Sequence, residues 1–291
     1  MESNHSKIKL DENLNKIIKS NPKLEYILDE NKEIYYEPPS IRLDPIKMNL
    51  LQKLIITEDP MILEYLMNNI HLYIDDINYQ NTYGHTALMI VCKHIHEKKL
   101  DLVKLLLENG ADPNLRDNQG NNSIINACYD DVFKNSNEII KMLSNYKTNI
   151  NLQNTDGDTA LILSCKHIVF KEKNIKVLLE NGADPNIQNK DGFTALMLLC
   201  EELDVHYNME IYNIYYFTII KSNRDITFKK YNAKYHIIYM KILLEYNSDI
   251  SLKNNKGLTV SDIILQKPRT YSIDIMLKLL LDYGQFLKKN H

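Results

Sequence analysis

Apolar residues along this chain gather in pairs of short helical segments, and residues 155–189 show one complete pair. Thr159 precedes the apolar run 160–165, and a second apolar run, 175–179, is followed by Gly182. A threonine hydroxyl can cap the start of the first helix, and a glycine can take the left-handed conformation that closes the second. The pattern therefore predicts a unit made of a turn, a helix, a turn, a second helix and a loop.

The same unit recurs along the chain, and its turn glycines mark the interval. Successive turn glycines are 36, 37, 35 and 65 residues apart, at Gly84, Gly120, Gly157, Gly192 and Gly257. Two positions after each glycine stands a residue able to cap a helix: Thr86, Asn122, Thr159, Thr194 and Thr259. The remaining three of the eight glycines are predicted to close second helices, at Gly110, Gly182 and Gly284. A fixed interval of this length is typical of a repeat protein.

Two motifs in these units resemble the ankyrin repeat. Gly-x-Thr-Ala-Leu occurs at 84–88, 157–161 and 192–196, and Leu-Leu-Glu-Asn-Gly-Ala-Asp-Pro-Asn occurs at 106–114 and 178–186. The resemblance implies an all-α fold, an ankyrin-repeat solenoid of stacked helix-turn-helix units with β-turn or hairpin connectors. The chain further resembles the ankyrin families of giant, mimivirus-type DNA viruses in three features. These are the sequence Thr-Ala-Leu-Met, the longer turn between helices and the surplus of Asn, Ile, Lys and Tyr.

The spacing also predicts how the chain is divided. Residues 1–42 are expected to form an N-terminal flanking region with a degenerate helical repeat, and residues 43–291 the solenoid. Its units are expected at about 48–80, 81–117, 118–154, 155–189, 190–254 and 255–291.

The double-length unit 190–254 is interpreted as carrying an insertion at 204–234, with the second helix resuming at Tyr235. The alternative is a collapsed extra repeat, because residues 219–225 echo residues 243–249. The insertion is favoured, because the span between Asp225 and Asp249 is too short for two helices and a turn.

Composition narrows the function classes. The formal net charge is −3 and the isoelectric point is about 6.3, and there is no basic block, so nucleic-acid binding is not expected. No apolar run is long enough to cross a membrane, and the polar N-terminus does not resemble a signal peptide. We therefore expect a monomeric, intracellular protein, in the cytoplasm, or in the host cytoplasm if the protein is viral.

Four cysteines occupy one repeated position, eight residues after a turn glycine: Cys92, Cys128, Cys165 and Cys200. Equivalent residues of neighbouring units lie about 8–10 Å apart, beyond disulfide reach, so we interpret them as reduced core thiols. The nearby histidines suggest zinc, but zinc needs about four converging ligands, and these cysteines are expected to point into the stack while the histidines lie at the outward-facing end of the same helix. No catalytic residue, cofactor site or metal site is predicted, and an enzyme is not expected.

Function is therefore expected to lie in the surface. The resemblance implies a non-enzymatic protein-protein interaction module whose partner binds the concave face, and in a viral protein that partner could be a host factor. The alternative is a structural or packaging component that uses the solenoid as a spacer. Carried over from the family, the candidate contact residues at the turn tips are Tyr83, His85, Gln119, Asn121, Asp156, Asp158, Asp191 and Phe193. Those on the first helices are Lys93, His94, Tyr129, Asp130, Lys166, His167, Glu201 and Glu202.

Overall fold

The computed structural model describes residues 12–21, 24, 48–94, 98–129, 136–166, 172–201, 224–267 and 271–290. The chain divides into two compact units, Met1–Asn118 and Gln119–His291, which are taken in turn. Every regular element in the described ranges is a helix. The predicted division at residue 42, and the unit boundaries along the solenoid, stay predictions.

The first unit is built from short helices, each begun by a capping side chain where one is available. Asn49 accepts a hydrogen bond from the Gln52 amide, and Asp59 accepts two before Pro60. The helices are α1 (Glu12–Ser20), α2 (Leu50–Ile55), α3 (Pro60–Asn69), the 3-10 helix η2 (Ile70–Asp76), α4 (Ala87–His94) and α5 (Lys99–Glu108). Helix α1 lies within the flanking region in which the sequence predicts a degenerate helical repeat, and most of that region lies outside the described residues.

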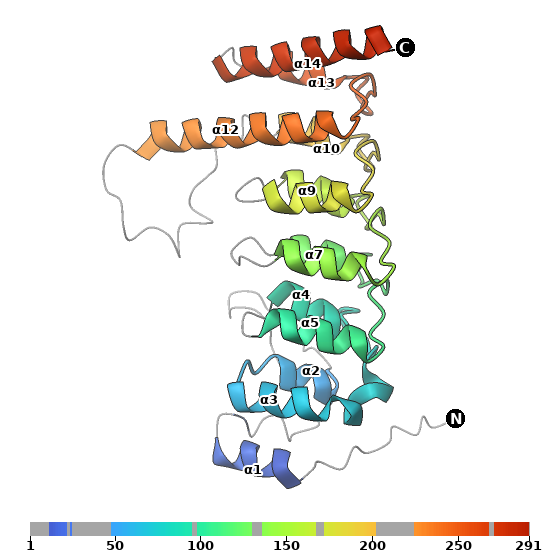
Figure 1. Cartoon of the computed structure of the whole chain (residues 1–291), viewed down its shortest axis with the longest axis vertical. Coiled ribbons are helices and arrows are strands. Elements are labelled where there is room, and N and C mark those ends of the chain that lie inside the picture. The colour runs from blue at the N-terminus through green and yellow to red at the C-terminus, as the bar shows by residue number, and fades with distance from the viewer. Residues whose placement is uncertain are drawn as a thin grey trace. The chain divides into compact units, whose positions relative to one another are not determined.

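The second unit repeats a pair of helices, and Figure 1 shows the pairs as successive layers. Its helices are α6 (Ser123–Cys128), α7 (Ser136–Ser144), α8 (Ala160–Lys166), α9 (Glu172–Glu180), α10 (Ala195–Glu201), α12 (Arg224–Glu245), α13 (Val260–Leu265) and α14 (Tyr271–Asn290). First helices pack in the order α6, α8, α10 and α13, and second helices in the order α7, α9, α12 and α14. The alternation of apolar segments thus predicted the layers of this unit.

The predicted capping residues start the first helices. The hydroxyl of Thr159 accepts the Ile162 amide at 3.2 Å, and the same bond occurs at Thr86 and Thr194. The side chain of Asn122 makes the equivalent bond at 3.0 Å. Thr259 adds a reciprocal bond, because its amide and hydroxyl donate to the Asp262 carboxylate. These donors hold the pKa of the Asp262 carboxyl below its usual value.

The turn glycines adopt the left-handed conformation that the sequence predicts. All five have φ between 76° and 80°. The second-helix positions follow the same rule: Gly110 and Gly182 have φ near 90°, and in two other units Lys147 (φ 55°) and Asn247 (φ 62°) take that conformation. A non-glycine residue there costs about 1–2 kcal/mol, and asparagine costs less than lysine because its side chain can bond locally.

Gly284 does not close a helix, so that prediction was wrong. It lies inside α14, which continues to Asn290. The physical reason is that Gly110 and Gly182 are each followed by Ala-Asp-Pro-Asn and a new hairpin, which require the helix to end. After Gly284 comes Gln-Phe-Leu-Lys, which can continue a helix.

The second helix of the double-length unit begins eleven residues earlier than predicted. Helix α12 starts at Arg224 rather than Tyr235, because residues 224–234 contain no glycine or proline to interrupt it. The hairpins on either side bond directly: Asn255 N donates to Asp191 O at 3.1 Å. This direct bond between the two hairpins favours one insertion over an extra repeat. Residues 204–223 of the insertion lie outside the described residues.

Candidate functional site

The turns that carry the candidate tip residues are linked to one another by backbone hydrogen bonds. In the first unit Asn118 N donates to Tyr83 O at 3.0 Å. In the second unit Thr155 N donates to Gln119 O at 2.8 Å, and Lys190 N to Asp156 O at 3.1 Å. Each turn therefore holds the next at a fixed spacing, and the tips form an ordered row within each unit.

Glutamines four residues before the turn glycine reinforce this row. The amide of Gln153 donates to its own turn at Gly157 O (2.7 Å) and to Gln188 O of the following turn (2.9 Å). Gln80 makes the same two bonds, to Gly84 O and Arg116 O, both at 2.7 Å. One side chain thus satisfies carbonyl groups of two consecutive repeats.

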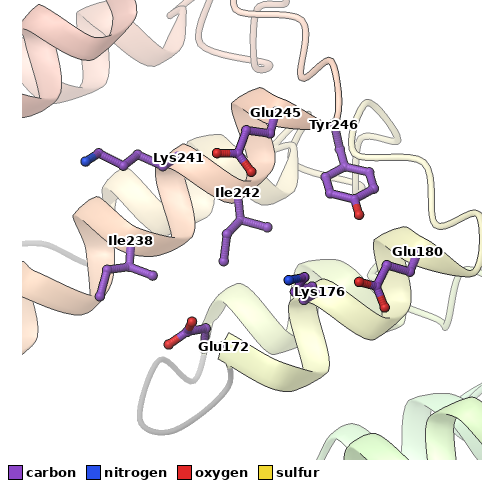
Figure 2. A pocket seen from close by; sticks show the side chains of 8 residues that line it. All are labelled: Glu172, Lys176, Glu180, Ile238, Lys241, Ile242, Glu245 and Tyr246. Atoms are coloured by element: carbon purple, nitrogen blue, oxygen red, sulfur yellow. The ribbon is translucent and has the colours of Figure 1, made fainter.

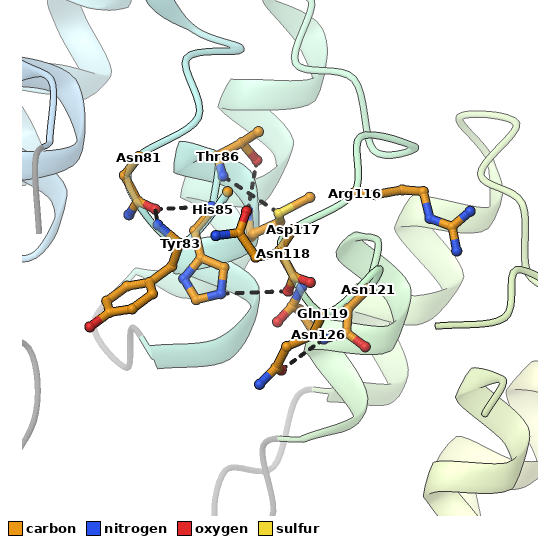
Figure 3. Close-up of polar contacts among 12 residues, drawn as sticks. Asn81, Tyr83, His85, Thr86, Arg116, Asp117, Asn118, Gln119, Asn121 and Asn126 are labelled. Carbon is orange, nitrogen blue, oxygen red and sulfur yellow. Dashed lines mark hydrogen bonds and ion pairs between the residues drawn. The ribbon is translucent and has the colours of Figure 1, made fainter. Parts of the chain in front are cut away.

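Asparagines three residues before the turn glycine close four of the five turns, and Asp117 stands at that position before Gly120. The Oδ1 atom of Asn154 accepts the amides of Asp156 and Asp158, both at 2.9 Å. The same pair of bonds recurs at Asn81, Asn189 and Asn254. Figure 3 shows the Asn81 example. The sequence analysis missed these glutamines and asparagines, although their fixed distance from the turn glycine was a signal that could have found them.

The residue that follows the turn glycine is part of this bonding, which corrects two predictions. Asn154 Nδ2 donates to Asn121 Oδ1 at 3.1 Å, and Asn189 Nδ2 donates to Asp158 Oδ1 at 2.9 Å. Both acceptors are buried. Asn121 and Asp158, predicted as partner contacts, instead hold neighbouring turns together, because the following asparagine needs an acceptor on its inner side.

The corresponding residue of the first unit, His85, is partly exposed and also faces the next turn. Its Nε2 lies 3.5 Å from Asp117 Oδ2 (Figure 3). The His85 ring lies 6.3 Å from the ring of Tyr83 and 6.4 Å from that of His94, measured between centroids. The structure thus brings three of the predicted site residues together in the first unit, in an aromatic and imidazole cluster.

Phe193 breaks the bonding pattern of the second unit. It occupies the position of Asn121 and Asp158 but offers no acceptor to the asparagine of the next turn, Asn254. The Nδ2 atom of Asn254 is buried and has no hydrogen-bond partner. The next residue in this row, Leu258, is also apolar and, like Phe193, half-buried. At this point in the row, the apolar side chains of Phe193 and Leu258 therefore take the place of a polar contact between turns.

The other candidate residues divide by exposure. At the tips Gln119, Asp156 and Asp191 are exposed, and Tyr83 is half-buried. On the first helices Lys166 is exposed, whereas Lys93, His94, Tyr129 and Glu201 are half-buried. Three predicted contacts, Asp130, His167 and Glu202, lie outside the described residues. The described candidates that remain accessible share one side of each repeat, made of the turn tips and the ends of the first helices.

The last repeat contributes equivalent positions that the sequence analysis left out. Counting from Gly257 by the same offsets gives Lys256, Leu258, Gln266 and Lys267. Lys267 Nζ donates to the Glu201 carbonyl at 2.7 Å and lies 3.8 Å from the Glu201 carboxylate. Because this lysine bonds to the end of α10, it ties the last two first helices together.

The four repeated cysteines are buried, and none is in a disulfide. Burial raises the pKa of the Cys165 thiol well above its ordinary value, and the neighbouring Cys200 adds to that effect. Burial likewise raises the pKa of Cys200. These two thiols therefore stay protonated at neutral pH, whereas zinc binding and nucleophilic attack require a thiolate. Among the residues with described positions, no group of three or more His, Cys, Asp or Glu side chains could hold a metal.

Replacing Cys165 by alanine should lower the free energy of unfolding by only about 1 kcal/mol, because a small side chain is trimmed in a packed core. Chemical denaturation of Cys165→Ala beside the parent protein would measure this. The metal content of both proteins serves as the second readout. Stoichiometric zinc in the parent that is lost in the variant would contradict the assignment as a core thiol.

A pocket of ≈560 Å³ lies between α9 and α12, on the second helices (Figure 2). Ile238 and Ile242 form its apolar part, and the remaining lining side chains are Glu172, Lys176, Glu180, Lys241, Glu245 and Tyr246. None of these side chains is a cysteine, serine or histidine nucleophile. The pocket therefore provides no evidence for catalysis.

The helices of the described ranges include none that is both long enough and apolar enough to cross a membrane.

Comparisons with known proteins agree with the repeats seen in the structure. The family model for ankyrin repeats (3 copies) matches residues 24–117, 51–143 and 124–209. A stretch of 49 residues is 45% identical to an ankyrin repeat protein of Acanthamoeba polyphaga mimivirus, and it covers 17% of this chain but only 11% of that protein. The crystal structure of the ankyrin repeat protein EF0377 superposes with a TM-score of 0.56 at 24% identity, covering 80% of this chain and 96% of that one. At that identity the superposition shows the fold alone.

Proposed function

The chain belongs to the ankyrin-repeat family, and from this we propose that it binds another protein through its row of turn tips and first helices. Ankyrin repeats are generally protein-protein interaction modules without catalytic activity. The fold class predicted from the sequence, an all-α ankyrin-repeat solenoid, is confirmed. The identity of the partner and the residues that contact it are the proposal.

This surface is supported by the contrast between the inner and the outer residues of the same turns. The inner residues recur: the asparagine that closes the turn is present in four of the five turns, and the glutamine that bonds to the next turn in three. The outer positions vary more, with four residue types among five repeats: Tyr83, Gln119, Asp156, Asp191 and Lys256. A rigid scaffold that presents varied side chains is suited to recognition, because little conformational entropy is lost when a partner binds.

The chemistry of the surface indicates what kind of partner would fit. In the first unit the accessible side chains are aromatic and basic, including Lys93 and His94. In the second unit the accessible charges are of both signs, with Asp156 and Asp191 at the turn tips and Lys166 on a first helix, 4.0 Å from Asp158. The half-buried Phe193 provides an apolar anchor of the kind that dominates binding energy. We therefore propose a partner with an apolar residue flanked by charges of both signs.

A binding experiment with matched variants tests the surface. Once a pull-down has identified a partner, Lys166→Glu combined with Phe193→Ala should weaken binding about tenfold or more, since a charge contact and an anchor are lost together. Lys176→Glu is the matched control, because Lys176 is exposed on the second helix of the same repeat as Lys166. Equal loss in both variants, or loss with a lowered melting temperature, would count against this surface.

The similarity to a mimivirus protein supports a viral setting, in which the protein would act on host factors in the host cytoplasm. A structural or packaging role is the second candidate. The same pull-down separates the two, because a spacer would be recovered with bulk particle proteins and without a defined stoichiometric partner.

A further inference from the structure

The outer face of α13 and α14 exposes positions that form the core of earlier repeats. Leu265 lies eight residues after Gly257, the position that cysteines occupy in the preceding four repeats. Those cysteines are buried, whereas Leu265 is 65% exposed. The position thus carries an apolar side chain in all five repeats but is covered in only four.

Leu281 of α14 shows the same contrast. Its equivalent on α9, Leu179, is 4% exposed, whereas Leu281 is 66% exposed. The difference follows from the layer order, because α9 is covered by α12 and α12 by α14, which form the layers that follow them (Figure 1). Two large leucines on adjoining helices therefore lie exposed on the side where a further layer would pack.

Charged residues on α14 belong to the same face. Asp274 and Lys288 lie seven residues before and after Leu281, which is about two helical turns, so all three share one side of the helix. Both charged residues are exposed. In α9 the residue equivalent to Asp274 is Glu172, which borders the pocket against α12 (Figure 2). This face of α14 is thus the one that meets a neighbouring layer elsewhere in the unit.

We propose that a second copy of this chain covers this face, with the two α14 helices antiparallel about a two-fold axis near Leu281. In that arrangement Leu281 meets Leu281 of the second copy, and Asp274 lies opposite Lys288 of the second copy. The symmetry makes this charge pair occur twice. A parallel arrangement would instead place Asp274 against Asp274, so the charge pattern selects the antiparallel one.

Stacking of the α14 face on the N-terminal repeat of another copy fits less well. The exposed residues of α1 are Glu12, Asn13, Lys16, Lys19 and Ser20, all polar. An apolar surface gains little by burial against a polar one. The exposed residues of α1 therefore offer no apolar counterpart to Leu265 and Leu281.

The size of the face predicts a weak dimer. Helix α14 has 20 residues and is therefore about 30 Å long, and with α13 alongside the face is about 20 Å wide. Roughly 600 Å² per copy, or about 1,200 Å² in total, lies at the lower limit of specific interfaces. The dimer is therefore expected to dissociate on dilution, in contrast to the monomer that the sequence alone predicts.

Sedimentation velocity of the full chain over a range of micromolar concentrations tests the proposal. We expect a reversible monomer-dimer equilibrium, and Leu281→Lys should weaken it at least tenfold because the change occurs twice at the centre of the interface. Met61→Lys is the matched control, since Met61 is 60% exposed in the first unit. A parent protein that stays monomeric, or that grows beyond a dimer, would overturn the proposal.

Charge reversal tests the antiparallel register independently. Asp274→Lys alone and Lys288→Asp alone should each weaken the dimer about tenfold, because two exposed pairs are lost and replaced by repulsion. The double variant Asp274→Lys/Lys288→Asp should restore it, since both pairs reform with reversed sign. Absence of restoration would rule out the proposed register.

Discussion

Replacing Gly157 by valine should lower the free energy of unfolding by about 3–5 kcal/mol, since backbone strain and a steric clash add. Gly157 has φ 80°, a conformation that a β-branched residue adopts only with strain. A Cβ atom there would lie 2.6 Å from Lys190 N, and 3.1 Å from the backbone of Asn189. The backbone of the following turn would have to move, and the hydrogen bond from Lys190 N to Asp156 O would be lost. Chemical denaturation measures the change.

Gly182→Val separates the two causes. Gly182 has φ 90°, but nothing lies within 4 Å of a Cβ built on it. We expect this variant to lose only about 1–2 kcal/mol, the cost of the backbone conformation. If the two valine variants were equally destabilised, close approach of consecutive turns would not be what requires glycine at 157.

Replacing Asn154 by alanine should lower the free energy of unfolding by about 2–4 kcal/mol, because three hydrogen bonds are lost at once. Asn154 is buried, accepts the amides of Asp156 and Asp158, and donates to Asn121. The variant leaves a buried backbone amide without an acceptor. Thermal and chemical denaturation of the full chain would both report the loss.

Asn154→Asp is the informative control, and we expect it to cost about 1 kcal/mol or less. Aspartate keeps both acceptor bonds to the turn, and the Asn121 side chain can rotate to donate to the carboxylate. The chain itself supports this substitution, because Asp117 stands at the equivalent position opposite His85. An aspartate variant as unstable as the alanine variant would mean that the stabilisation comes from the bond between turns rather than from turn closure.

Much of this protein could be predicted from sequence because its repeats are made of local interactions. A turn glycine, a capping threonine two residues later and an apolar run together specify a helix start without reference to the rest of the chain. Thr159, Gly157 and Gly182 therefore behave as predicted, and the repeated cysteine position correctly indicated a buried one. The fixed interval indicated a repeat protein, and the two motifs within the repeats carried the resemblance to the ankyrin family, which the family model confirms.

Tertiary structure decided which side chains of the repeat are accessible. The sequence placed Asn121 and Asp158 at turn tips beside Asp156, but a neighbouring asparagine turns the first two inward and buries them. Sequence position alone could not show this, because the donor comes from the following repeat. The exposed part of the predicted surface is thus narrower than the pattern suggested.

Where a helix ends, and which residues at the end of the stack are exposed, also depends on more than the local sequence. Gly284 has the spacing of a helix-closing glycine, yet no turn follows it, so α14 continues. Leu265 and Leu281 have the pattern of core residues, yet both are exposed, because none of the described helices packs over them. The sequence by itself determined what each repeat is, because a repeat is specified by contacts a few residues apart. Only the packing of neighbouring layers determined what each position does, because burial depends on residues of the next repeat.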